Sequence, residues 1–137
     1  MSDILFVDDM KSPAYYGLKE GIRIARTGEA AWDIVKKRSI NNPIQELWLD
    51  FDLSDTGMNG LGLLKRMTEA GIAPKKVICI SYNVTGAEQI KVYCLDNEIP
   101  FEHRLMEGTN IAGSIIITDW YEELRKQKAK DGDKNEH

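Results

Sequence analysis

Short apolar segments alternate with amphipathic segments along this chain of 137 residues. The continuous apolar run at residues 4–7 is typical of a strand covered on both faces, as the strands of parallel sheets are. The segment 21–25 alternates between apolar and polar positions instead, which also indicates a strand. We therefore predict five strands, at residues 4–7, 21–25, 46–49, 76–80 and 99–105.

Between these strands, apolar side chains recur at the spacing of a helix. Thr27 and Asn110 are N-cap residue types, and each precedes such a segment. The segment 10–20, between the first two strands, contains Pro13 and Gly17, so the first helix should be short or distorted. We predict the other helices at residues 28–37, at 60–70, at 85–95 and after Asn110.

Alternating strands and helices form βα units, in which a mostly parallel sheet carries helices on both faces. The pattern therefore predicts an α/β fold, a doubly wound, five-stranded parallel sheet, in one domain over residues 1–125. Residues 126–137 carry charges of both signs and almost no apolar side chains, so we predict a disordered tail there.

The composition excludes several classes of protein. A formal charge of −4 argues against general nucleic-acid binding. No apolar stretch approaches the roughly 20 residues of a membrane span, and the first residues do not form a signal peptide, so we expect a cytoplasmic protein that does not enter a membrane. Cys79 and Cys94 are better explained as buried thiols than as a disulfide or a zinc site.

Acidic and hydroxyl side chains follow three of the predicted strands. Asp8 and Asp9 follow the first strand, Asp50 and Asp52 the third, and Ser81 the fourth. Parallel α/β sheets bind ligands beyond the carboxyl ends of their strands. If the third strand continued, its period of two would place Asp50 and Asp52 on the same side.

Carboxylates that converge in this way repel each other unless a cation lies between them. Hard oxygen ligands beside a solvent-filled crevice suit Mg²⁺, which leaves room for a phosphate. For any single one of these aspartates, a cap on the next turn is an equally good explanation. For the three strand ends together, the ligand site is the favoured interpretation.

Three stretches of the sequence, DILFVDD, LWLDFDL and VICISYN, resemble motifs of the receiver domain of two-component signalling. There, an acidic pair ends the first strand, a phosphoacceptor Asp ends the third, and Ser or Thr ends the fourth. The resemblance covers residues 3 to about 125 and implies a flavodoxin-like (βα)5 fold. It implies that Asp8 and Asp9 hold Mg²⁺, and that Asp50 and Ser81 meet the phosphoryl group.

The sequence resembles a narrower receiver-like family, described as cyclic-phosphate processing, more closely. The motifs D-D-x-R-x-P, L-D-H-D-L and S-x-N-P-x-G of that family match residues 8–13, 49–53 and 81–86, and its first helix is also curtailed. In this chain Lys11 replaces the Arg of the first motif, Phe51 the His and Val84 the Pro. Ordinary receivers also end the fifth strand with Lys-Pro, which this chain lacks.

Two cations could contact a phosphate that such a metal holds. Lys11 lies three residues after Asp8 in a tight loop, although it could equally be a solvated loop lysine. Arg26 ends the second strand and could form a bidentate contact to a carboxylate or a phosphate. Ser81 and Asn83 would help to position the phosphate. The turn from Asn83 to Gly86 also leads into a helix whose first N–H groups form a natural anion site.

We interpret the chain as a receiver-like protein whose Mg²⁺-dependent acidic pocket binds or processes a phosphate or cyclic phosphate ester. Asp8, Asp9 and Asp50 would hold the metal, and Asp50 or Asp52 would act as nucleophile or base. The alternative is a stand-alone receiver, with or without phosphorylation of Asp50, that binds a protein partner through its sheet or last helix. A cation that enters the pocket from the fifth strand would support phosphoacceptance on Asp50; the sequence does not decide whether the pocket is catalytic.

Overall fold

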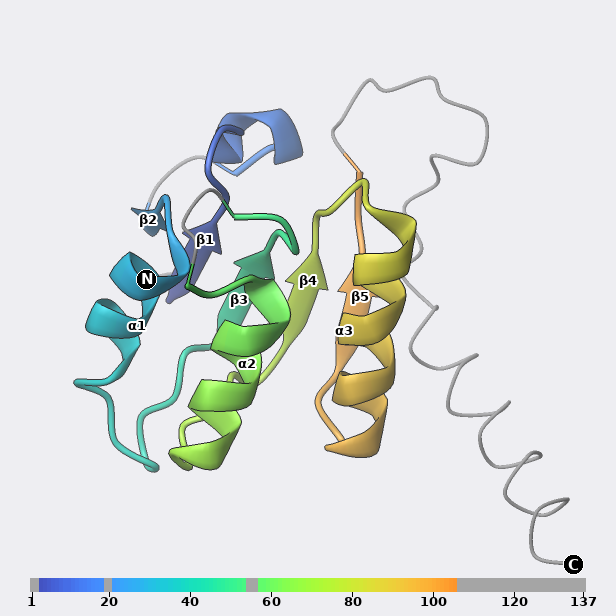
Figure 1. Cartoon of the computed structure of the whole chain (residues 1–137). Coiled ribbons are helices and arrows are strands. Elements are labelled where there is room, and N and C mark those ends of the chain that lie inside the picture. The colour runs from blue at the N-terminus through green and yellow to red at the C-terminus, as the bar shows by residue number, and fades with distance from the viewer. Residues whose placement is uncertain (1–2, 19–20, 54–56, 106–137) are drawn as a thin grey trace, which may run out of the picture.

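The computed structural model describes residues 3–18, 21–53 and 57–105. All five predicted strands are present and form one parallel sheet in the order β2-β1-β3-β4-β5 (Figure 1). This is the strand order of flavodoxin-like folds, so the predicted fold class is confirmed. The strands are β1 (Ile4–Val7), β2 (Ile22–Ala25), β3 (Glu46–Leu49), β4 (Val77–Cys79) and β5 (Phe101–His103).

Three of the predicted α-helices are present as α1 (Gly28–Val35), α2 (Gly60–Glu69) and α3 (Val84–Asp96). Each begins after a side chain that accepts a hydrogen bond from a backbone N–H of the first turn, namely Thr27, Asn59 and Asn83. The first helix is one turn of 3₁₀-helix, η1 (Pro13–Tyr16), which ends at the left-handed Gly17. The prediction of a short first helix is therefore confirmed.

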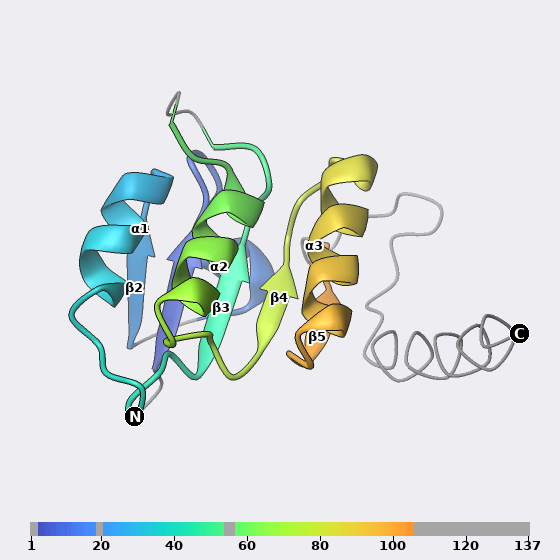
Figure 2. The same cartoon turned by 60° about the horizontal axis from the view of Figure 1, so that its bottom comes forward.

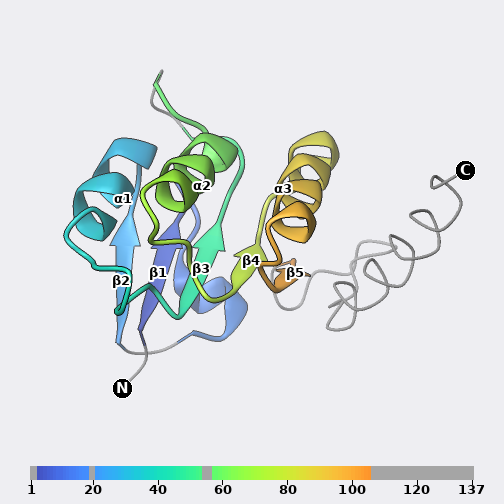
Figure 3. The same cartoon turned by 90° about the horizontal axis from the view of Figure 1, so that it is seen from below.

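The three α-helices pack on the same face of the sheet, and η1 lies on the other face (Figures 2 and 3). Helices on both faces were predicted, but within the described part of the chain the second face carries only this 3₁₀ turn. The predicted last helix after Asn110, its proposed contact with a partner, and the tail at 126–137 lie outside the described residues.

Side chains alternate between two apolar clusters, one on each face of the sheet. Leu5 and Val7 point toward the α-helices, whereas Phe6, between them, packs with Tyr16 and Trp48 on the face of η1. Both clusters are almost completely buried, which explains why β1 is a continuous apolar run in the sequence. Cys79 and Cys94 are buried free thiols, as predicted. None of the helices in the described ranges is long and apolar enough to cross a membrane.

Candidate metal and phosphate site

Three aspartates meet beyond the carboxyl ends of β1 and β3, where the strand order reverses. Val7 pairs with Leu49 in the parallel register, and the N–H of Asp50 donates to the carbonyl of Val7 at 3.0 Å. Asp8 and Asp50 are therefore adjacent across the sheet. With Asp9 they present carboxylate oxygens that all lie within 4.8 Å of one another. The carboxylates of Asp8 and Asp50 are buried, and that of Asp9 is half-buried.

The two oxygens of Asp8 have different partners. Oδ1 accepts the backbone N–H groups of Met10 and Lys11, each at 2.8 Å, which fixes the loop after β1. Oδ2 is buried, and its partner is the ammonium of Lys11 at 2.9 Å. Burial opposes the ionisation of Asp8, but these N–H groups and the ammonium outweigh it and lower its pKa.

Asp50 is shifted in the opposite direction. Burial raises the pKa of the Asp50 carboxyl, and the negative charge of Asp8 adds to this effect. The ammonium of Lys11, 3.8 Å from Asp50 Oδ2, and a hydrogen bond with Ser81 oppose the rise without cancelling it. The pKa values of the two buried carboxylates are therefore shifted in opposite directions.

The donor set fits Mg²⁺. Carboxylate oxygens are the hard ligands that this ion prefers, and three of them can reach one point from two strands. The buried Oδ2 of Asp8 points to a cation site, because a buried charge is costly unless a cation meets it, and in this structure the ammonium of Lys11 is that cation. Asp8, Asp9 and Asp50 are the residues that would hold the ion.

The two predicted phosphate-binding cations lie in different surroundings. Lys11 reaches the carboxylates, and its Nζ also lies 5.2 Å from the centroid of the Tyr82 ring. Arg26 instead donates through Nη1 to the backbone carbonyls of Asp8 and Lys11, at 3.1 and 2.6 Å. It therefore holds the loop that carries the site, and its contact with a phosphate stays a prediction.

Asp52 does not join the carboxylate cluster. The condition for Asp50 and Asp52 to share one side, a third strand that continues through them, is not met, because β3 ends at Leu49. Asp50 is buried, whereas Asp52 is exposed and accepts a hydrogen bond from Asn83 Nδ2 at 3.0 Å. Asn83 Oδ1 caps α3, and its N–H donates to Ser81 Oγ at 3.0 Å. Asp52 and Asn83 thus form the outer rim of the site.

No cation of the described residues reaches the carboxylates from β5. His103 Nε2 lies 2.8 Å from the carbonyl oxygen of Ser81, and burial lowers its pKa. Arg104 pairs with the buried Glu102, and its guanidinium stacks 5.0 Å from the Trp48 ring. The lysine that an ordinary receiver contributes from this strand therefore has no equivalent in the described structure.

Two glycines, whose role the sequence did not reveal, allow the loops of the site to approach the helices. A Cβ at Gly60 would lie 2.1 Å from the carbonyl oxygen of Asp50. A Cβ at Gly86 would lie 2.3 Å from the Phe51 ring, which stands where the related family has His. Neither contact involves residues close in sequence, so spacing alone could not indicate it.

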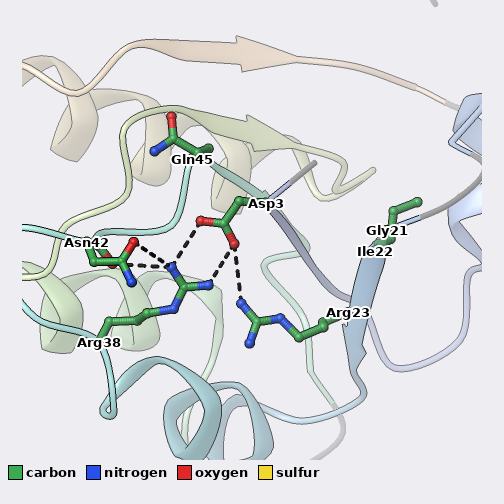
Figure 4. Close-up of a pocket in the computed structure, with 7 residues that line it drawn as sticks. All are labelled: Asp3, Gly21, Ile22, Arg23, Arg38, Asn42 and Gln45. Carbon is green, nitrogen blue, oxygen red and sulfur yellow. Dashed lines mark hydrogen bonds and ion pairs between the residues drawn. The ribbon is translucent and has the colours of Figure 1, made fainter. Parts of the chain in front are cut away.

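A hollow of about 850 Å³ lies at the opposite, amino-terminal end of the strands (Figure 4). Arg38 holds both carboxylate oxygens of Asp3, at 2.7 and 3.0 Å, and Arg23 adds a contact at 3.3 Å. The hydrogen bond with Arg38 is the main reason why the pKa of Asp3 lies below its usual value. Because this carboxylate is already paired, the hollow does not fit a metal ion.

The comparisons with known proteins agree with this fold. The family model of the cyclic-phosphate processing Receiver domain matches residues 4–97. No curated protein matches the chain. One similar solved structure is described as the yeast Spc42 trimeric coiled coil, amino acids 181–211, fused to another structure. It is 20% identical, with a TM-score of 0.51 over 94% of this chain and 80% of that one, which shows the fold alone.

Proposed function

The chain belongs to the cyclic-phosphate processing receiver domain family, and on this basis we propose that its acidic pocket binds Mg²⁺ together with a phosphate or a cyclic phosphate ester. The observation that carries the proposal is the convergence of Asp8, Asp9 and Asp50, whose carboxylate oxygens all lie within 4.8 Å of one another. Such a cluster stores unfavourable charge that a divalent cation would neutralise.

Each residue of the site has a distinct part in this proposal. Bound Mg²⁺ would polarise the phosphoryl oxygens and make the phosphorus a better electrophile. The hydroxyl of Ser81 and the ammonium of Lys11 are close enough to Asp50 to hold a phosphate next to the carboxylates. Asp50 is the candidate nucleophile. Asp52, exposed at the rim beside Asn83, is the candidate base for a water molecule.

The alternative, phosphoacceptance on Asp50 followed by docking to a partner protein, has less support. A phosphoacceptor needs a cation opposite the metal to balance the charge that develops on the transferred group. The cation near Asp50 is Lys11, which comes from the loop after β1 and already contacts Asp8. The position of Lys11 therefore suits the binding of an intact ester better than it suits the transfer of a phosphoryl group from a small donor.

The test is calorimetry with Mg²⁺, alone and then with a nucleoside 2′,3′-cyclic phosphate. Millimolar Mg²⁺ should bind and raise the melting temperature by mass action, and the ester should bind only when Mg²⁺ is present. Asp9→Asn should weaken both ligands, because it removes one metal ligand. Asp33→Asn, which changes an exposed aspartate of α1 paired with Lys36, is the matched control and should bind like the wild type.

Three results would contradict the proposal. The first is the absence of Mg²⁺ binding at millimolar concentration, and the second is equal binding by the Asp9→Asn variant. The third is near-stoichiometric aspartyl phosphate on Asp50 after treatment with acetyl phosphate, which mass spectrometry would detect. This third result would favour the phosphoacceptor, and we expect poor labelling instead.

A further inference from the structure

Lys11 lies where a metal ion would be expected. Its Nζ is 2.9 Å from Asp8 Oδ2 and 3.8 Å from Asp50 Oδ2, and its side chain is only 19% exposed. The first of these oxygens is buried. The ammonium is thus the charge that compensates the cluster in this structure.

An ammonium and a divalent ion cannot share this position. Magnesium–oxygen bonds are about 2.0–2.1 Å long, so an ion that binds Asp8 and Asp50 would occupy the space between their oxygens. Lys11 Nζ already contacts one carboxylate from each of these two residues. Two like charges so close together repel strongly, and more so in a half-buried site than in water.

We propose that Lys11 is a resident counter-ion that Mg²⁺ must displace, and that the displaced ammonium then binds the phosphate. This inference rests on the function proposed above and adds the order of events: Mg²⁺ displaces Lys11, and Lys11 then binds the phosphate. The metal alone binds weakly, because it first has to break the contacts of Lys11. A phosphate gives the ammonium a new partner, so metal and phosphate bind with positive cooperativity.

The structure allows this exchange with little change of the backbone. The N–H of Lys11 is held by Asp8 Oδ1 at 2.8 Å, and its carbonyl is held by Arg26 at 2.6 Å. Only the flexible four-carbon side chain has to move. The ring of Tyr82, 5.2 Å from Nζ and 40% exposed, lies beside this path and can stabilise the cation outside the cluster.

The experiment compares the Mg²⁺ affinity of the wild type with that of Lys11→Met, by calorimetry without phosphate. We expect Lys11→Met to bind Mg²⁺ at least about tenfold more tightly, because a like charge within a few ångströms is removed. Lys11→Arg keeps the charge and should bind like the wild type. Lys75→Met removes an exposed lysine between α2 and β4 and controls for the change in net charge.

The second part repeats the titrations with inorganic phosphate. Phosphate should tighten the binding of Mg²⁺ to the wild type, and this gain should be lost in Lys11→Met. As a measurement that needs no variant, the side-chain NMR signals of Lys11 in the wild type should shift with the same midpoint as Mg²⁺ binding.

The outcomes separate this inference from the proposed function. If the wild type binds Mg²⁺ and phosphate but Lys11→Met binds Mg²⁺ equally well or more weakly, only the inference is overturned. Unchanged Lys11 signals at saturating Mg²⁺ would also overturn it, even if the variant failed to fold. If neither the wild type nor Lys11→Met binds Mg²⁺ under any condition, both proposals fail.

Discussion

The substitution Gly60→Ala tests how the first turn of α2 holds the backbone of Asp50. A Cβ at this position would lie 2.1 Å from the carbonyl oxygen of Asp50, 3.0 Å from its carbonyl carbon and 3.1 Å from the Cα of Phe51. All three atoms belong to the backbone, so a change of rotamer cannot relieve the contact. The N–H of Gly60 also donates to the carbonyl of Phe51 at 2.9 Å, which keeps the two segments together.

The magnitude follows from two opposing effects. The carbonyl oxygen would have to move by about 1 Å to restore a normal van der Waals distance, and overpacking of this kind costs about 1–3 kcal/mol. Alanine is favoured over glycine in a helix by at most about 1 kcal/mol. We therefore expect Gly60→Ala to lower the free energy of unfolding by about 1–2 kcal/mol and to weaken Mg²⁺ binding through Asp50.

Gly62→Ala is the matched control in the same turn of α2. Its Cβ would lie 3.2 Å from Met58 Cγ and 3.5 Å from Asn59 Oδ1, both of which belong to side chains that can adjust. It should stabilise the protein by up to about 1 kcal/mol. Urea denaturation of both variants and calorimetry with Mg²⁺ are the assays. Equal stability of the two variants, or a stabilised Gly60→Ala with normal Mg²⁺ affinity, would refute the reasoning.

Three further predictions concern charged residues. Asp50→Asn should leave the metal-free fold equally stable or make it more stable at pH 7, because ionisation of the buried Asp50 is unfavourable. Denaturation at pH values from 3 to 7 should show that this gain in the free energy of unfolding disappears below about pH 4, where Asp50 of the unfolded chain is protonated. Asp3→Asn should destabilise by about 1 kcal/mol above about pH 4, because its pKa is lowered by Arg38, and the difference from the wild type should shrink as pH falls further. Arg26→Met should weaken Mg²⁺ binding in calorimetry, because the loop after β1 loses two hydrogen bonds of about 1 kcal/mol each while the carboxylates are unchanged. Unchanged affinity would mean that this loop keeps its conformation without Arg26.

The sequence alone determined the order and type of the elements, because the signals for them are local. The buried run at β1 and the capping side chain of Thr27 depend only on neighbouring residues. Pro13 and Gly17 likewise indicated that the first helix is short. Since parallel strands bring their carboxyl ends to one edge, the sequence also predicted that Asp8, Asp9 and Asp50 meet.

Only the tertiary structure decided what surrounds those carboxylates. Because β3 ends at Leu49, Asp52 lies outside the cluster that contains Asp50, although only Phe51 lies between the two in the sequence. The fold of the loop after β1 placed the ammonium of Lys11 among the carboxylates and turned Arg26 toward the loop carbonyls. These outcomes depend on distances between segments far apart in the chain, and a difference of one or two ångströms decides whether a lysine is a solvated side chain or the counter-ion of a metal site.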